Sequence, residues 1–412
     1  MLHVFHTTVP HTLCMHSGPT DCSYFIALLV SQAEQIPESQ HKQSHRTSHC
    51  SLSLHFLIMA SNGSDEAPAK RIKRRRQDED GFYFKSYAGV SIHEEMIRDE
   101  VRTNSYRLAI LRSSEQIAGK IVADIGAGTG ILSCFCAQAG AKKVYAIEAS
   151  AIAEQARKVV KSNGMEQQIQ VIQGKVEDVE LPEKVDVIVS EWMGHFLLYE
   201  SMLNSVIYAR DKWLKKGGII LPSKASLYLA PITNEEIYKE RIDFWSEVKS
   251  KYRLNMDCMI PYAKECIFGS VQIEDVIGSD LIAHEREVAT IDISTITEQE
   301  LQSIQGSFDF KCFGISKFCG FAAWFTVTFD DIQDRDPVTI STSPYKHPTH
   351  WKQSVLYLPE PVSVEQDTEM KGLITLSPGM TNSRYLDVAL QYTVGEMPQI
   401  SRHYTMSDDY PS

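Results

Sequence analysis

The stretch that decides the fold is VADIGAGTG at residues 122–130, where a short apolar run ends in three closely spaced glycines. Such a run is typical of a buried strand, and residues 131–139, which follow, carry the apolar content of a helix. Glycine permits a tight turn between the two and lets a ligand approach backbone that carries no side chain. The stretch therefore predicts a strand, a ligand-binding turn and a helix.

Strands and helices continue to alternate on both sides of this stretch. Such an alternation predicts an α/β, doubly wound, Rossmann-like domain with a mainly parallel sheet, which we place at residues 82–220. The expected strands are 121–125, 143–147, 169–173 and 185–190, and the expected helices are 93–114, 131–139, 152–163 and 202–213.

Beyond the Gly217-Gly218 pair the pattern changes to short strands separated by turn residues. This predicts an antiparallel, β-barrel-like second domain over residues 221–412. A helical segment rich in aromatic residues interrupts it at about 234–259, and such an arm packs on its own domain or docks on a second subunit. The expected strands are 219–222, 224–232, 306–313, 321–329, 339–342, 356–357, 373–376 and 385–394.

Two classes of nucleoside cofactor fit the glycine turn. Glu148 ends the next strand, where a carboxylate can accept both hydroxyls of a ribose. A dinucleotide site favours Gly or Ala at the position that Ile131 occupies. The pattern D-x-G-x-G-x-G instead resembles the S-adenosylmethionine loop of class I methyltransferases. That resemblance implies that Asp124 orients the loop and that Gly126 and Gly128 lie beneath the amino-acid part of the cofactor.

A second unusual feature is the segment SEWMGHFLLYE at residues 190–200, which follows the fourth strand. It carries two carboxylates, Glu191 and Glu200, separated by eight mostly apolar residues. On an exposed hairpin both would simply be solvated. In a pocket the two anions would repel each other unless a cation lay between them. A guanidinium fits best, because it is planar and gives paired hydrogen bonds to carboxylates.

The segment resembles the double-E loop of the protein arginine N-methyltransferases. Three further stretches resemble motifs of that family in the same order, so the resemblance extends from about residue 82 to 404. The double-E loop departs from the usual pattern in one place, because His195 stands where the family usually has Tyr. The other stretches are YFKSY at 83–87, HEEMIRD at 93–99 continuing to RTNSY at 102–106, and THW at 349–351.

The resemblance implies a role for each matching residue. Glu191 and Glu200 would bracket the target arginine, holding its charge to one side so that the attacking nitrogen keeps its electron density. Arg102 would pair with the cofactor carboxylate, His93 would contact the amino-acid end of the cofactor, and Glu177 would meet the adenine. As an alternative, each of these three is an ordinary surface residue.

Four further residues match the family near the target arginine. Tyr83 and Tyr87 would close over the active site. His350 and Asp99 resemble a pair that links the barrel to the N-terminal helix. The pair could accept the proton that the arginine sheds, or hold two domains together. We favour the second role, because a methylated guanidinium has a pKa far above that of His and needs no strong base.

Two methionines bear on the product. Met96 and Met202 match the type I members, which form asymmetric dimethylarginine, whereas members that form the symmetric product carry a bulkier Phe near the first position. A slim, flexible Met leaves room for a methylated nitrogen to turn back toward the cofactor. Two ordinary core methionines are the alternative.

A short basic run stands out in a chain that is acidic overall. With 41 Lys and Arg against 53 Asp and Glu, the formal net charge is −12, although KRIKRRR at residues 70–76 is strongly basic. That run lies in a polar stretch, 59–81, that we expect to be a disordered tail with a nuclear-import signal. Residues 1–58, rich in His and poor in charge, are expected to be an unstructured extension arising from an upstream start codon.

Composition excludes several classes of protein. No stretch approaches the roughly 18 apolar residues of a membrane span. A net acidic chain argues against direct binding of nucleic acid. The nine cysteines form no C-x-x-C pair, which argues against a metal site and a disulfide framework.

The resemblance thus implies a nuclear, S-adenosylmethionine-dependent protein arginine methyltransferase of type I. It would act on arginine-rich proteins, histones included, and regulate chromatin and transcription. The arm at 234–259 would join two copies into a homodimer. A small-molecule methyltransferase and a catalytically silent chromatin-binding scaffold are the rival functions.

Overall fold

The computed structural model describes residues 80–330 and 336–407. The expected extension over residues 1–58 lies outside the described residues. So does nearly all of the expected tail at 59–81, including its basic run. The first described segment, residues 80–86, is helical.

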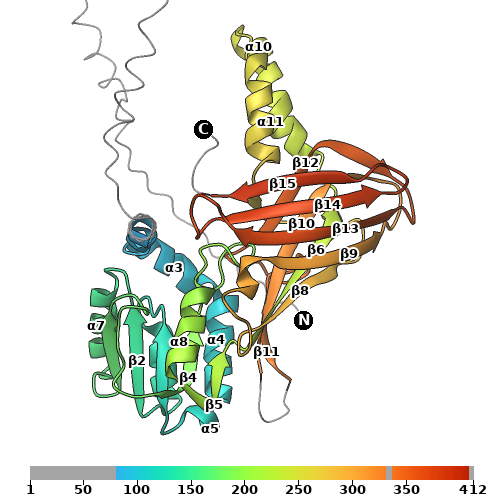
Figure 1. Cartoon of the computed structure of the whole chain (residues 1–412). Coiled ribbons are helices and arrows are strands. Elements are labelled where there is room, and N and C mark those ends of the chain that lie inside the picture. The colour runs from blue at the N-terminus through green and yellow to red at the C-terminus, as the bar shows by residue number, and fades with distance from the viewer. Residues whose placement is uncertain (1–79, 331–335, 408–412) are drawn as a thin grey trace, which may run out of the picture. The chain divides into compact units, whose positions relative to one another are not determined.

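The first sheet is parallel and has five strands in the order β3-β2-β1-β4-β5. All five residues of β1 are buried, as expected of a central parallel strand. Connecting helices pack on the sheet (Figure 1). The strands are β1 (Ile121–Ile125), β2 (Lys143–Glu148), β3 (Ile169–Gln173), β4 (Val185–Ser190) and β5 (Leu214–Leu221), and the helices are α6 (Ile131–Gln138), α7 (Ala153–Ser162) and α8 (Leu203–Trp213).

Two expectations for this half of the chain need correction. The segment expected as one helix over 93–114 is divided into α3 (Val90–Arg98), α4 (Glu100–Arg112) and α5 (Ser114–Ile117). The helix breaks at Asp99, whose side chain instead caps α4 by accepting from the backbone N–H of Arg102. Residues 219–222, which we expected in the barrel, belong largely to β5 of the parallel sheet. The strand was not recognised because its first residues are polar and exposed.

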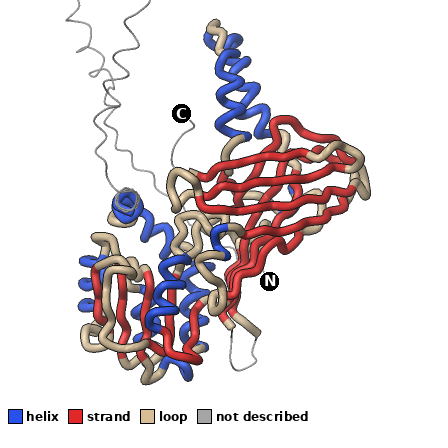
Figure 2. The backbone as a smooth tube through the Cα atoms, in the orientation of Figure 1, coloured by secondary structure: helices blue, strands red, loops and turns tan. Residues whose placement is uncertain are grey.

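Two antiparallel sheets form the barrel-like second part. One has the order β7-β12-β10-β6-β8, with β11 beside β10, and the other has the order β15-β14-β13-β9 (Figures 1 and 2). The strands are β6 (Lys224–Ile232), β7 (Gln272–Glu274), β8 (Arg286–Asp292), β9 (Ile304–Lys311), β10 (Ser316–Phe329), β11 (Val338–Ser341), β12 (Gln353–Val364), β13 (Glu369–Pro378), β14 (Leu386–Val394) and β15 (Ile400–Met406). Strands β7, β8 and β15 were not expected, because they are short or alternate with charged residues.

The helical arm extends further than expected, to Phe268 instead of residue 259. It stands out from the strands as a helical pair (Figure 2). Pro261 lies in the first turn of the last helix, where the backbone N–H has no partner within the helix and its loss costs little. The arm comprises α9 (Glu236–Tyr238), a π-helical turn (Lys239–Asp243), α10 (Phe244–Tyr252), a 3₁₀ turn (Asp257–Met259) and α11 (Ile260–Phe268).

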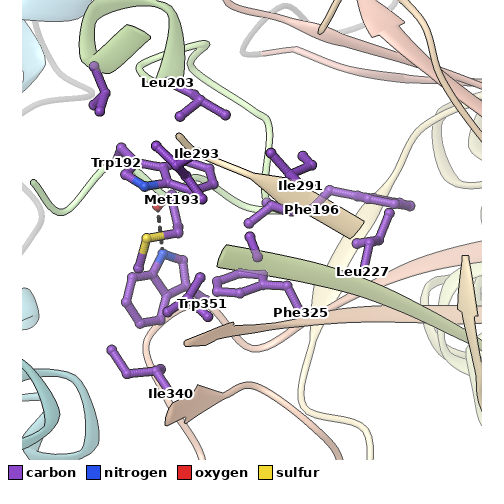
Figure 3. Close-up of a cluster of buried hydrophobic side chains, with 14 of the residues drawn as sticks. Trp192, Met193, Phe196, Leu203, Leu227, Ile291, Ile293, Phe325, Ile340 and Trp351 are labelled. Carbon is purple, nitrogen blue, oxygen red and sulfur yellow. Dashed lines mark hydrogen bonds between the residues drawn. The ribbon is translucent and has the colours of Figure 1, made fainter. Parts of the chain in front are cut away.

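One hydrophobic cluster runs from the parallel sheet into the barrel. Its junction is built from Trp192, Met193 and Phe196 of the acidic segment, which pack with Phe325 and Trp351 of the barrel (Figure 3). The Trp351 Nε1–H donates to the backbone oxygen of Met193 over 2.8 Å. The barrel therefore supports the segment that carries both carboxylates.

Candidate active site

A cavity opens at the carboxyl ends of the parallel strands, where such sheets bind ligands. It holds about 1030 Å³ of space free of atoms, open solvent at its mouth included. It brings together twelve of the residues predicted from the sequence. They are Tyr83, Tyr87, His93, Met96, Arg102, Gly126, Gly128, Glu148, Glu177, Glu191, Glu200 and Met202.

The glycine turn forms the floor of this cavity. Gly126, Gly128 and Gly130 have φ angles of +72°, +55° and +84°, in the left-handed region that side chains disfavour. A Cβ on Gly126 would come within 2.1 Å of the Met202 Cε. A side chain at this position would therefore collide with Met202, which also lines the cavity.

Glu148 lies at the end of β2, beside the glycine turn. One carboxylate oxygen accepts from the backbone N–H of Gly128 at 2.8 Å, and the other accepts from that of Ser150 at 2.7 Å. These two bonds fix the carboxylate at the rim of the cavity, where it can receive the hydroxyls of a ribose.

Asp124 is predicted as a site residue but does not line the cavity. It is fully buried behind the turn, where Ser133 on α6 donates to its Oδ2 at 2.6 Å. Its Oδ1 has no hydrogen-bond partner. Burial raises the pKa of this carboxyl to about 7. Because its side chain binds α6, Asp124 can affect the cavity only indirectly, by holding the glycine turn in position.

Glu191 and Arg102 form a buried ion pair. Both the Nε and an Nη of Arg102 donate to Glu191 Oε2 at 3.2 Å, and the two side chains are only 6% and 9% exposed. Another Nη–H of Arg102 donates to the backbone oxygen of Met96 at 3.2 Å. The residue predicted to bind the cofactor and one predicted to bind the target arginine are thus in direct contact.

Glu200 has a different environment, made of tyrosines. The Tyr87 hydroxyl donates to Glu200 Oε2 at 2.8 Å. Burial raises the pKa of the Glu200 carboxyl, and the nearby charge of Glu191 acts in the same direction, against hydrogen bonds from Tyr87 and Tyr83. A cation between the two carboxylates would remove this mutual repulsion.

The acidic segment is held in an uncommon backbone conformation. Phe196, Leu197, Glu200 and Ser201 have φ angles of +52°, +67°, +76° and +55°. Non-glycine residues rarely adopt this left-handed region, and each such residue costs on the order of 1 kcal/mol. Packing against the barrel holds the turn in place.

Three other predicted residues lie at the cavity edge. His93 on α3 places its ring against Gly128, and its Nε2 lies 2.9 Å from the backbone oxygen of Tyr87. Glu177 accepts from the Ser205 hydroxyl at 2.7 Å. The Met96 sulfur lies 3.9 Å from an Arg102 Nη, so this methionine lies beside the ion pair.

Asp99 and His350 meet outside the cavity. Asp99 Oδ2 lies 2.7 Å from His350 Nδ1 and accepts from the His350 backbone N–H at 3.0 Å. Burial opposes ionisation of this carboxyl, but hydrogen bonds from His350 and the Arg102 backbone lower its pKa. The pair joins the barrel to the break between α3 and α4.

His195, the departure from the family pattern, lies against the THW loop. Its Nδ1 is 3.1 Å from the backbone oxygen of Trp351, and burial lowers the pKa of the imidazole. The ring does not line the cavity.

Sequence reasoning missed Arg384, which lines the cavity from the barrel. Its guanidinium lies 3.9 Å from the Tyr83 ring centre and donates to the backbone oxygen of Glu200 at 2.8 Å. No local signal marks it, because it is a single arginine in a polar turn far from the other motifs.

The described part of the chain offers neither a metal-binding cluster nor a membrane-spanning helix. Among residues 80–330 and 336–407, no three His, Cys, Asp or Glu side chains gather in a way that could hold a metal. Within the same ranges, no helix combines the length and the apolar character that crossing a membrane requires.

Comparison with known proteins gives two family matches. Residues 122–218 match the family described as a methyltransferase domain, and residues 223–397 match the arginine methyltransferase oligomerization subdomain. The protein arginine N-methyltransferase 6 of Danio rerio is 52% identical over 348 residues, which cover 84% of this chain and 99% of that protein. That of Xenopus tropicalis is 52% identical over 330 residues, covering 80% and 96%.

Solved structures give a consistent result. The PRMT1 enzyme–prozyme heterotetrameric complex of Trypanosoma brucei with AdoHcy matches with a TM-score of 0.72 and 35% identity, over 78% of this chain and 100% of that one. Protein arginine methyltransferase 10 of Arabidopsis thaliana matches with a TM-score of 0.71 and 33% identity, over 79% and 100%. The sequence relatives and the solved structures are thus all named as protein arginine methyltransferases.

Proposed function

The chain belongs to the protein arginine N-methyltransferase family, and from this premise we propose that it transfers methyl groups from S-adenosylmethionine to arginine side chains of proteins. The single observation that carries the proposal is the cavity shared by the glycine turn and the two carboxylates, Glu191 and Glu200. A nucleoside and a guanidinium would meet there. A relative was solved with AdoHcy, the cofactor that remains after methyl transfer.

Residues on the cofactor side would bind and orient. Glu148, already fixed by two backbone N–H groups, would accept the ribose hydroxyls. Arg102 would pair with the carboxylate of the cofactor and His93 would contact its amino-acid end. Glu177 would meet the adenine. When bound, S-adenosylmethionine supplies an electrophilic methyl group on a sulfonium.

Residues on the arginine side would set the geometry of transfer. Glu191 and Glu200 would hold the guanidinium charge toward the carboxylates, which leaves electron density on the nitrogen that faces the methyl. Tyr83 and Tyr87 would close the cavity, and Tyr87 already donates to Glu200. Orientation and fixed charge are then the main sources of catalysis. The His350–Asp99 pair would hold the barrel to α4 and would not serve as the base.

We propose asymmetric dimethylarginine as the final product. Met96 and Met202 both line the cavity. Their unbranched side chains would let a monomethylated nitrogen return to the methyl donor. With this product the chain would be a type I enzyme.

We propose arginine-rich proteins, histones included, as substrates, with a role in chromatin and transcription. The net charge of −12 would attract basic segments at low ionic strength. The basic run at residues 70–76 supports a nuclear location, since such runs serve as import signals.

We also propose a homodimer joined by the helical arm. Its large apolar side chains include Tyr252 and Leu254, which are 69% and 63% exposed. The matched oligomerization subdomain, residues 223–397, spans the whole arm.

The proposed reaction is tested by incubating the full chain with methyl-labelled S-adenosylmethionine and a histone-tail peptide. A second peptide has every Arg replaced by Lys. We expect label only in the first peptide, recovered after hydrolysis as monomethyl- and asymmetric dimethylarginine. Label in lysine, or none, would refute the reaction. Symmetric dimethylarginine would refute only the proposed product.

The carboxylate role is tested with Glu200→Gln. We expect kcat to fall roughly 100- to 1000-fold, as when a fixed charge that serves the transition state is removed. Cofactor affinity should change little, because Glu200 contacts tyrosines and not Arg102. Glu154→Gln, an exposed acid on α7, is the matched control. Loss of cofactor binding with kcat retained would contradict this role.

A further inference from the structure

Arg384 belongs to the turn between β13 and β14, on the barrel. Its guanidinium lies over aromatic rings of the first described helical segment, with its central carbon 3.9 Å from the Tyr83 ring centre and 5.4 Å from that of Phe84. Cations bind aromatic faces in this range. A barrel residue thus contacts a segment more than 300 residues earlier in the chain.

The same guanidinium also binds Asp80, at the start of that segment. The Arg384 Nε–H donates to Asp80 Oδ1 at 3.1 Å, and an Nη of Arg384 contacts the same oxygen. The other oxygen of Asp80 pairs with Lys175, which follows β3 and lines the cavity. Burial opposes ionisation of Asp80, but these two cations lower its pKa. One carboxylate therefore ties residues 80–86 to both halves of the molecule.

Arg384 also binds the backbone of Glu200. An Nη–H of Arg384 donates to the Glu200 oxygen at 2.8 Å, and the Glu200 N–H donates to the Arg384 oxygen at 2.7 Å. One residue thus satisfies both backbone polar groups of Glu200. Glu200 has a φ angle of +76°, an uncommon conformation that needs such support.

We infer that Arg384 is a positioning residue that couples closure of residues 80–86 to the placement of the Glu200 carboxylate. The helical segment brings Tyr83 and Tyr87 over the cavity, and Arg384 holds that segment and Glu200 at the same time. The segment that would cover the methyl donor and the carboxylate that would bind the arginine are thus both held by Arg384. The inference rests on the proposed function, because it assigns Glu200 to the target arginine.

The geometry requires arginine and not lysine. A guanidinium donates in several in-plane directions while its face lies on an aromatic ring. Arg384 combines hydrogen bonds to Asp80 and Glu200 with a position over the Tyr83 ring. A lysine ammonium is a point charge without this planar fork, so it could not reproduce the full set of contacts.

The test compares Arg384→Lys with the full wild-type chain. We expect kcat for peptide methylation to fall roughly ten- to a hundredfold, as for loss of charge-assisted hydrogen bonds, with a smaller change in the peptide KM. Amide hydrogen exchange over residues 82–88 should become faster. Arg286→Lys is the matched control, since Arg286 donates to a barrel backbone oxygen, that of Asp309, at an exposed position.

Asp80→Asn provides the second variant. It should speed exchange over the same residues, and the double variant should lose little more kcat than Arg384→Lys alone, because both changes break one network. Unchanged kcat and exchange in Arg384→Lys would overturn the inference. So would lower kcat with normal exchange, or fully additive losses. If the wild-type chain methylates no arginine, the proposed function fails, while the exchange data still test the link between Arg384 and residues 82–88.

Discussion

At the scale of single residues, the two carboxylates of the acidic segment differ in what neutralises them. Glu191 is already paired with the buried Arg102, whereas the Glu200 carboxylate accepts from the Tyr87 hydroxyl, and the nearby Arg384 binds the Glu200 backbone oxygen. A buried carboxylate that forms no ion pair within the described residues binds an incoming cation more readily than one that is already paired. We therefore expect Glu200 to make the first contact with an incoming guanidinium. Glu191 would then lie between that guanidinium and Arg102.

A buried carboxyl beneath the glycine turn makes stability depend on pH. Asp124 has its pKa raised to about 7 by burial, so between about pH 4 and pH 7 the folded chain keeps a proton that the unfolded chain has lost. Stability from this group is then present at low pH and lost as pH rises. We therefore expect the free energy of unfolding of Asp124→Asn, measured relative to that of the wild type, to rise by on the order of 3 kcal/mol from pH 5 to pH 7.

This prediction is checked by urea unfolding of both proteins at several pH values. Asp186→Asn is the control, because hydrogen bonds from the Ile121 backbone and Lys215 outweigh burial and lower the pKa of Asp186. Its stability difference from the wild type should therefore be constant from pH 5 to 8. A flat profile for Asp124→Asn would mean that the buried carboxyl is not protonated in the folded state.

At the scale of elements, the acidic segment depends on a loop of the barrel. The Trp351 indole donates to the Met193 oxygen, and the Trp351 oxygen lies 3.1 Å from His195 Nδ1. Trp351→Phe would keep an aromatic ring but leave the Met193 oxygen without its donor. We expect a loss of about 1–3 kcal/mol in the free energy of unfolding and a lower kcat.

Cofactor affinity, measured by calorimetry, should stay near the wild-type value, because Trp351 does not line the cavity. Trp245→Phe, on the helical arm, is the matched control for the change of ring. A loss of cofactor affinity as large as the loss of kcat would show that the loop supports the glycine turn too.

The sequence predicts an element well when the contacts that define it lie close together in the chain, and poorly when they join distant residues. The glycine turn and the central strands were predicted well, because buried parallel strands and glycine turns have strong local patterns. The break at Asp99 was missed, since it depends on a side chain that caps the next helix and binds the distant His350. Arg384 was missed for the same reason, because its partners are distant in the sequence.

At the scale of the whole molecule, the helical arm is the surface that would join the two copies of the proposed homodimer. Tyr252 ends α10 and Leu254 lies two residues beyond it, and both expose large apolar side chains that a second copy would cover in the proposed dimer. The double change Tyr252→Glu with Leu254→Glu should convert a dimer to a monomer, because burying two new charges is costly. Sedimentation velocity measures this directly.

Ile315→Glu is the control, since Ile315 is 90% exposed on the barrel and outside the arm. It should leave the dimer intact. A dimer that withstands both arm changes would place the interface elsewhere in the chain.

The left-handed turn of the acidic segment sets a limit on how the enzyme can be improved. Glycine at Phe196, Leu197 or Ser201 would relieve a backbone cost on the order of 1 kcal/mol at each position. The same change would remove side-chain packing or release the turn that aims Glu200. Selection for heat resistance and selection for turnover would then favour opposite residues here. A thermostable variant of this chain is best sought at positions far from this turn.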